Sequence, residues 1–295
     1  MPSVLTRLAR RRGDLRSEDQ LREHYRIERE LADRLRASSK AERRMLYRLV
    51  YDELLRRVPH HPRLCEKRDD EWHRRRRREI EWQIGFLGRF LSLRTVFLEV
   101  GAGDCALALR LCDLAEHVYA VDVSYQAAIG TARPANFSFV FTEGCELRVP
   151  AGSVNVVFSN QLLEHLHPDD ALEQLRSIHA VLAPGGTYVC VTPNRLYGPR
   201  DVSGYFDERA TGLHLHEYSV REVLALFTAQ GFVNVRFFCG ARGWFLPCPY
   251  WILAGVEALL ERLPGSVRKR FADTAPMRAL LGLRFSAGKP EKATP

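Results

Sequence analysis

Val96–Ser124, with the sequence VFLEVGAGDCALALRLCDLAEHVYAVDVS, is the stretch that decides the fold. It begins with a short apolar run, Val96–Val100, whose β-branched residues are typical of a buried strand. The small residues Gly101–Gly103 come next, followed by apolar residues at helical spacing. A second apolar run, Val118–Val121, ends at Asp122. Strand, tight turn, helix and strand in this order predict the opening of a doubly wound α/β domain.

The glycine turn predicts half of a nucleoside-binding site. Glycines let the main chain approach a ligand closely, and an acid at the end of the next strand, here Asp122, can bind two adjacent ribose hydroxyls. With Ala106, the turn also fits the G-x-G-x-x-G/A pattern of NAD-binding proteins. Glu99 and Asp104 flank the turn, however, and carboxylates disfavour a phosphate-rich cofactor but tolerate a cationic sulfonium. This favours S-adenosylmethionine, with NAD as the alternative.

The stretch resembles the first motif of class I methyltransferases, a hydrophobic strand followed by E/D-x-G-x-G-x-G. Cys105 stands where the third glycine usually does. The resemblance extends over roughly residues 80–290, and it implies an α/β fold with a Rossmann-like, doubly wound, mostly parallel seven-stranded sheet. The other segments that match in the family's order are Asn160–Leu166, Pro184–Gly186, Thr192–Asn194 and His214–Phe232.

The resemblance implies cofactor contacts residue by residue. It places Glu99 near the ammonium group of S-adenosylmethionine, with a structural hydrogen-bond acceptor beneath the loop as the alternative role. It places Asp122 on the ribose hydroxyls and Cys145 at the position of the usual adenine-binding aspartate, where Glu146 or a backbone amide could serve instead. The cofactor-binding residues expected on this basis are Glu99, Gly101, Gly103, Asp122, Glu143, Gly144, Cys145, Asn160 and Gln161.

Histidines are the candidates for catalysis, because a hydroxyl acceptor benefits from a base and histidine titrates near neutral pH. His165 is the first choice, with helix capping or packing as its alternative role. His214 and His216 alternate with leucines, so we expect both on one side of an extended segment, as the second choice. The spacing Gln161…Glu164-His165 is similar to the Glu-x-x-Glu-His metal site of ubiquinone-biosynthesis O-methyltransferases. Because Gln161 removes a charge from that set, we expect no metal.

The basic surplus of the chain belongs to its N-terminal third. Residues 1–90 hold 25 Lys and Arg against 16 Asp and Glu, whereas the remaining residues hold 19 against 20. Capping-box pairs at Ser17 and Ser39 predict helices over 18–37 and 40–57. A third helix over 69–84 includes Arg74–Arg78; nucleic-acid binding is one interpretation, but nearby acids and the lack of interleaved aromatics favour a solvated or domain-bridging face. We expect a helical extension, 1–79, before a methyltransferase domain, 80–295.

Residues 240–280 are expected to form an insertion, with a helix over about 250–262. Its apolar residues from Trp244 to Leu253 could contact a lipid-linked acceptor or a bilayer surface, although an apolar lid is the preferred interpretation. Seven cysteines without a C-x-x-C pair indicate reduced thiols. With no secretory signal or membrane-spanning run in the sequence, we expect a cytoplasmic protein.

The sequence as a whole predicts an S-adenosylmethionine-dependent methyltransferase that methylates oxygen on a small molecule or a glycan. The alternatives are an NAD(P)-binding oxidoreductase, an RNA-directed methyltransferase that uses the basic N-terminal helices, and a scaffold that keeps the fold without the activity. The expected partner is a small-molecule or glycan acceptor. Nucleic acid is not expected, and peripheral membrane contact stays open.

Overall fold

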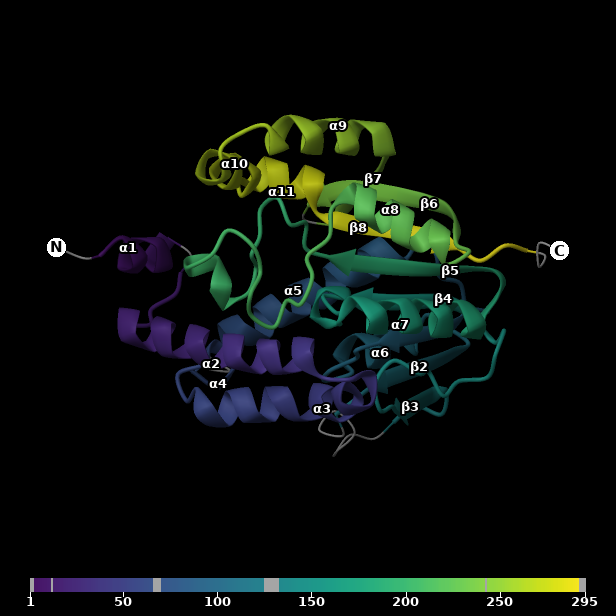
Figure 1. The fold of residues 1–295 in the computed structure, drawn as a ribbon. Coiled ribbons are helices and arrows are strands. Elements are labelled where there is room, and N and C mark those ends of the chain that lie inside the picture. The colour runs from purple at the N-terminus through teal and green to yellow at the C-terminus, as the bar shows by residue number, and fades with distance from the viewer. Residues whose placement is uncertain (1–2, 12, 66–69, 125–132, 242, 292–295) are drawn as a thin grey trace.

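A single mixed sheet forms the centre of the molecule (Figure 1). The computed structural model describes residues 3–11, 13–65, 70–124, 133–241 and 243–291. Within these residues the sheet has eight strands in the order β3-β2-β1-β4-β5-β8-β6-β7. The first five are mutually parallel, β8 is antiparallel to both β5 and β6, and β7 is antiparallel to β6. The strands are β1 (Val96–Val100), β2 (His117–Asp122), β3 (Phe137–Phe141), β4 (Val154–Asn160), β5 (Leu182–Thr192), β6 (Val233–Ala241), β7 (Trp244–Cys248) and β8 (Leu283–Gly288).

The predicted doubly wound, mostly parallel sheet is confirmed, but the predicted number of seven strands is wrong by one. The additional strand is β7, which pairs with β6 inside the segment expected to be an insertion. Its Pro247 lies on the outermost strand, where a missing N–H removes no ladder hydrogen bond. That proline and the shortness of the run hid the strand from the sequence pattern.

Helices cover both faces of the sheet (Figure 1). α7 and α8 lie on one face, where Ile178 and Phe227 join the larger apolar core. α5 and α6 lie on the other face, where Phe86 and Leu107 join a second core. α9, α10 and α11 gather at the β6–β8 end. The helices are α1 (Val4–Arg11), α2 (Glu18–Ala37), α3 (Lys40–Arg57), α4 (Pro62–Cys65), α5 (Asp70–Leu87), α6 (Ala106–Leu111), α7 (Pro168–Val181), α8 (Val220–Ala229), α9 (Tyr250–Glu261), α10 (Gly265–Ala272) and α11 (Ala275–Leu281), with short 3-10 helices η2 (Leu163–His165) and η3 (Val202–Tyr205).

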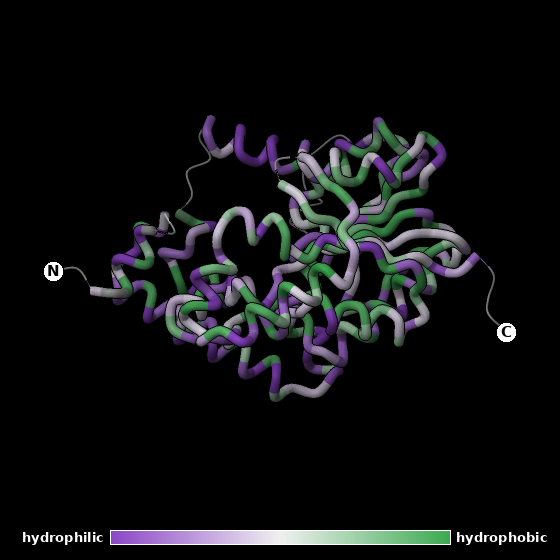
Figure 2. The backbone as a smooth tube through the Cα atoms, turned by 90° about the horizontal axis from the view of Figure 1, so that it is seen from above, coloured by the Kyte–Doolittle hydropathy of each residue, from purple (hydrophilic) through white to green (hydrophobic). Residues whose placement is uncertain are grey.

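α2 and α3 begin where the capping boxes predict. The side chains of Ser17 and Ser39 each accept from the backbone three residues on, and the reciprocal bonds are also present. The buried faces of both helices share one apolar core with the sheet, through residues such as Leu31 and Leu54. Their outer faces carry exposed charged residues such as Arg22 and Arg44. Hydrophilic and hydrophobic residues alternate along the helices of the molecule (Figure 2). The N-terminal helices are therefore packed on the α/β core by the ordinary burial of amphipathic faces.

α3 is also fixed to the α/β core by a buried ion pair. Arg43 donates to both carboxylate oxygens of Asp170 on α7, at 2.5 and 2.9 Å. Both residues are buried, and the Tyr47 hydroxyl donates to the same carboxylate at 2.6 Å. A buried carboxylate is stable only when charge-assisted hydrogen bonds replace its contacts with water. The ion pair therefore fixes the position of α3 relative to α7.

Two features of the sequence remain largely on the surface. In the run Arg74–Arg78 on α5, Arg76 is half-buried and pairs with Asp104 at 2.6 Å, while its neighbours are exposed. In β7 and α9, Trp244 is 81% and Trp251 is 72% exposed, whereas Phe245 packs on the rings of Trp82 and Phe86. In the described part of the chain, no helix is both long enough and apolar enough to cross a membrane.

Candidate active site

The glycine turn lies where the strand order of the sheet reverses. β1 and β4 are neighbours in the sheet; the chain passes from β1 to β2 on one side and from β4 to β5 on the other. Such a reversal is the usual place for a ligand in these folds. The backbone amides of Gly101 and Ala102 both point at the Val121 carbonyl of β2, at 2.8 and 3.2 Å. Gly101 has a φ of +74°, and a Cβ there would lie 3.2 Å from the Leu162 side chain. A side chain at this position would be strained, so glycine is favoured here.

Cys105 explains how the third glycine of the motif can be absent. It has a φ of +56°, a left-handed conformation that glycine adopts without cost, and it is the N-cap of α6. The thiol is buried in the second core. Cys105 thus keeps the backbone geometry of the motif, and its side chain packs in the core. The left-handed conformation costs about 1 kcal/mol or more for a residue with a side chain.

The two acids of the motif have different surroundings. Asp122 accepts from the Gly103 and Ser124 amides, each at 2.8 Å, so its carboxylate lies against the glycine turn. Glu99 is buried and accepts from the Ala108 amide of α6 at 3.1 Å, the structural role considered from the sequence. Burial, which outweighs this hydrogen bond, raises the pKa of Glu99 to about 8. Glu99 is therefore largely protonated at neutral pH and becomes a better partner for a cation once it ionises.

The segment expected to contact adenine is only partly open to solvent. Glu143 is exposed, whereas Cys145 is 3% exposed and belongs to the larger apolar core. Gly144, at a φ of +86°, lies against the Arg44 side chain of α3. An adenine contact here is therefore available from Glu143, Glu146 or the main chain rather than from the Cys145 side chain, which points into the core.

Asn160 and Gln161 end β4 beside the glycine turn. Val100 is in register with Ser159, so the residues that follow the two strands are neighbours. Gln161 has a φ of +53°, a strained conformation for a residue with a side chain, and its amide donates to Val191 at 2.8 Å. This geometry turns the Gln161 side chain into a cleft of 810 Å³ that also reaches His165 and His214.

His165, the first catalytic candidate, lies in η2 and lines this cleft. Its Nδ1 lies 3.0 Å from the Leu213 carbonyl oxygen and 2.9 Å from the Tyr51 hydroxyl of α3. Because a carbonyl oxygen can only accept, Nδ1 carries the proton and Nε2 has the lone pair. Burial, reinforced by the charge of His214, lowers the pKa of His165 to about 3. His165 is thus a neutral imidazole and a weak base.

His214, the second candidate, lines the same cleft and has a carboxylate partner. Its Nδ1 lies 2.6 Å from Oε1 of Glu217, and both side chains are buried. Burial alone would lower the pKa of His214, but the Glu217 hydrogen bond and the charge of Glu164 outweigh it and raise the pKa. Glu217 contacts Nδ1 of His214 and leaves Nε2 for another partner. A histidine whose ring is oriented by a carboxylate in this way is a common arrangement for a general base.

His216 does not share the side of the chain that its spacing predicts. It lines a separate cleft of 400 Å³, and its Nε2 lies 3.5 Å from Glu222. The segment is irregular rather than a regular strand, since the His216 amide donates to the Glu164 carbonyl at 3.1 Å. Alternation along the chain therefore does not predict direction here. The structure brings His165 and His214 together and places His216 elsewhere.

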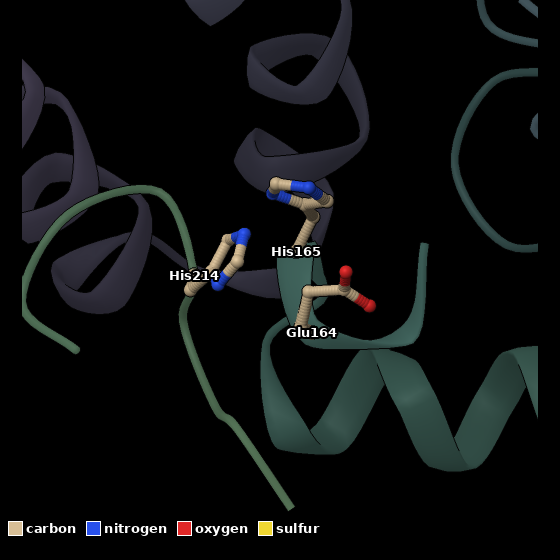
Figure 3. A group of neighbouring side chains, drawn as sticks. All are labelled: Glu164, His165 and His214. Atoms are coloured by element: carbon tan, nitrogen blue, oxygen red, sulfur yellow. The ribbon is translucent and has the colours of Figure 1, made fainter. Parts of the chain in front are cut away.

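Glu164 completes a cluster with the two histidines (Figure 3). One donor atom from each of Glu164, His165 and His214 lies within 4.8 Å of the others, a spacing from which a metal ion could be held. Glu164 is fully buried; Oε2 accepts from Thr192 at 2.8 Å, and Oε1 has no hydrogen-bond partner among the described residues. The expectation of a site without a metal stays a prediction.

The comparisons with known proteins agree with this geometry. A family model described as a methyltransferase domain matches residues 98–190. A protein of Mycolicibacterium smegmatis named as an S-adenosylmethionine-dependent methyltransferase is 30% identical over 137 residues, which are 46% of this chain and 51% of that protein. A Mycobacterium tuberculosis protein with the same kind of name is 31% identical over 144 residues, 48% of this chain and 50% of that one. The chain thus spans about half the length of these relatives.

Solved methyltransferase structures share the fold. The methyltransferase in a complex with the Haloferax volcanii Trm112 activator has a TM-score of 0.51 at 16% identity, over 77% of this chain and 97% of that one. The 1,6-didemethyltoxoflavin N1-methyltransferase of Burkholderia thailandensis has a TM-score of 0.50 at 18% identity, over 86% and 91%. The comparisons support the resemblance to class I methyltransferases: residues 98–190 match a methyltransferase domain, and the relatives are named as S-adenosylmethionine-dependent enzymes. Of the two cofactors that the glycine turn allows, the comparisons support S-adenosylmethionine over NAD.

Two residues that contact the histidines of the cleft escaped the sequence analysis. Glu217 stands three residues after His214, so a search for a carboxylate near each candidate histidine would have found it. Tyr51 is 114 residues before His165, and no local pattern relates them. The apolar spacing of α3 predicts which side of the helix is buried, but it does not distinguish Tyr51 from an aromatic residue that only packs in the core.

Proposed function

We propose that the protein transfers the methyl group of S-adenosylmethionine to an oxygen atom of a small polar molecule or a glycan. The observation that carries this proposal is the cleft of 810 Å³ that joins Gln161, beside the glycine turn, to the imidazoles of His165 and His214. An acceptor in this cleft would lie between the methyl donor and a pair of nitrogen bases. The sulfonium is already activated, so the enzyme has mainly to align the acceptor and remove a proton.

The cofactor half of the proposal assigns each residue a role. Gly101 and Gly103 leave the main chain open to the methionine part, and Asp122 exchanges its bonds to backbone amides for bonds to the ribose hydroxyls. Glu99 faces the ammonium group from beneath the loop. Asn160 and Gln161 close the pocket beside the methyl group.

The catalytic half of the proposal places the proton on His214. Its partner Glu217 stabilises the imidazolium, and its raised pKa makes it the stronger base of the two histidines in the cleft. His165, with its lowered pKa, stays neutral and contacts the acceptor as a hydrogen-bonding group. His216 takes no direct part, because it lines the other cleft.

The lining of the cleft supports a polar acceptor. Arg200 and Arg278 lie at 3.2 and 3.0 Å from the single carboxylate of Asp273, and Arg63 places its guanidinium over the ring of Tyr51. Asp201 supplies a further hydrogen-bonding group. Such a surface suits hydroxyl-rich molecules, whereas an apolar chain would leave these charged groups desolvated.

The experiment is a methyl-transfer assay with donor labelled in the methyl group. Glucose, UDP-glucose, catechol and total RNA serve as acceptors, together with a small-molecule extract of the source cells. We expect label in a hydroxyl-bearing small molecule, at least tenfold less with His214→Ala, and unchanged S-adenosylmethionine affinity in that variant. Label confined to RNA would favour the RNA-directed alternative, and no label in any arm would contradict the proposed activity.

A further inference from the structure

The loop that carries His214 is held by α2. The Arg36 guanidinium donates to the carbonyls of Thr211 and Gly212, at 3.1 and 3.2 Å, and Oε1 of Glu28 accepts from the Leu213 amide at 3.0 Å. Gly212 lies so close to Glu28 that a side chain there would collide with its carboxylate. The segment just before His214 therefore follows the surface of α2 closely.

Leu213 is also held through its carbonyl. Its carbonyl accepts from Nδ1 of His165, and the Tyr51 hydroxyl of α3 lies against that nitrogen. Leu213 thus connects Glu28, through its amide, with His165, through its carbonyl, and that carbonyl belongs to the peptide that leads into His214. A displacement of Leu213 would turn both imidazoles at once, because the two peptides that flank its Cα are held by different partners.

Glu28 is itself firmly placed. Its side chain is buried, and its second oxygen lies 2.8 Å from Nε2 of His24, one turn earlier on α2. The Arg16 guanidinium contacts Nδ1 of the same histidine at 2.5 Å and pairs with Asp14. A buried carboxylate with one oxygen on the Leu213 amide and the other beside the His24 ring has little room to move, which suits a residue that sets the position of another segment.

From these contacts we infer that Glu28 and Tyr51 are positioning residues for methyl transfer, and that the N-terminal helices set the orientation of His165 and His214. This inference rests on the proposed function, since it concerns how the base of that function is oriented. Both side chains border the cleft, but their role in this inference is indirect: Glu28 acts through Leu213, and Tyr51 acts through the His165 ring. A misplacement of about 1 Å can cost as much as ~10²-fold in rate, so such contacts have measurable effects.

The test uses the full chain labelled with ¹⁵N-histidine and saturated with S-adenosylhomocysteine, so that it needs no acceptor. In the parent protein we expect His165 to show a single Nδ1-protonated form. Glu28→Ala removes the acceptor of the Leu213 amide, so the His165 signals should move towards a mixture of tautomers. Glu28→Gln keeps a carbonyl oxygen at that place and should restore the single form. Glu30→Ala, on the outer face of the same helix and paired with Arg57, is the matched control.

The rate measurement uses whichever of glucose, UDP-glucose or catechol takes up the label. We expect Glu28→Ala to lower kcat about tenfold while the KM for S-adenosylmethionine stays within twofold. If Glu28→Ala does not fold, Tyr51→Phe, which keeps the ring, should change the His165 signals and lower kcat several-fold. A folded variant with a single His165 form, or with kcat within twofold of the parent, would overturn the inference. Since the tautomer readout requires no turnover, its failure is distinct from a failure of the proposed function.

Discussion

The ion pair between Arg43 and Asp170 gives the sharpest prediction about the N-terminal helices. The two side chains are 5% and 3% exposed, and removing Arg43 leaves the Asp170 carboxylate buried with Tyr47 as its remaining donor. Breaking such a pair costs about 3–5 kcal/mol. Since 1 kcal/mol changes the Tm of a domain of this size by about 2–4 °C, Arg43→Ala should lower the Tm by roughly 6–20 °C.

Arg44 supplies the matched control for this measurement. It is the next residue on α3 and pairs with Glu173, but its side chain is 46% exposed. A pair so exposed contributes less than about 1 kcal/mol, so Arg44→Ala should change the Tm by no more than about 4 °C in the same calorimetric scan. Equal Tm values for the two variants would refute the reasoning that α3 is fixed to the α/β core through a desolvated pair.

Two predictions concern the cofactor. Asp122→Ala should weaken S-adenosylmethionine binding by roughly 30- to 1,000-fold in calorimetry. Two charge-assisted hydrogen bonds to the ribose are lost, and they contribute about 2–4 kcal/mol after the exchange with backbone amides. The control Asp113→Ala, at an exposed residue, should leave the affinity unchanged; an equal affinity of both variants for S-adenosylmethionine would remove the ribose assignment. The pKa of about 8 at Glu99 means that a bound ammonium group expels its proton, so affinity should rise with pH between about 6 and 7.5, by at most tenfold per pH unit. Calorimetry in buffers of different ionisation enthalpy would detect the proton released on binding. Glu99→Gln should abolish this release. If the variant released as many protons as the parent protein, the titrating group would be a residue other than Glu99.

Much of the fold was predictable because its signals are local. The capping serines at positions 17 and 39 give the starts of α2 and α3, and the limits of β1 follow from its apolar run and the glycine turn. The helices of residues 265–281 were not predicted as separate elements. Their N-cap residues are Pro264 and Thr274, neither of which forms a side-chain capping bond, so they lack the signal that identified the others.

The candidate site was predictable only in its cofactor half. Gly101, Gly103 and Asp122 lie close in sequence, and parallel strands bring the ends of their segments to one edge of the sheet. The acceptor half is assembled from α2, α3, η2 and an irregular loop, so Tyr51 meets His165 through tertiary packing alone. Alternation also misplaced His216, because the loop around it is not a regular strand.

The central claim is that the turn at Gly101–Gly103, facing Asp122, binds the adenosine and methionine parts of S-adenosylmethionine. The most direct measurement is calorimetric titration of the full chain with S-adenosylmethionine and, separately, with NADH. We predict one site for S-adenosylmethionine that is weakened by Asp122→Ala, and no heat from NADH. Saturable binding of NADH without binding of S-adenosylmethionine would contradict the account.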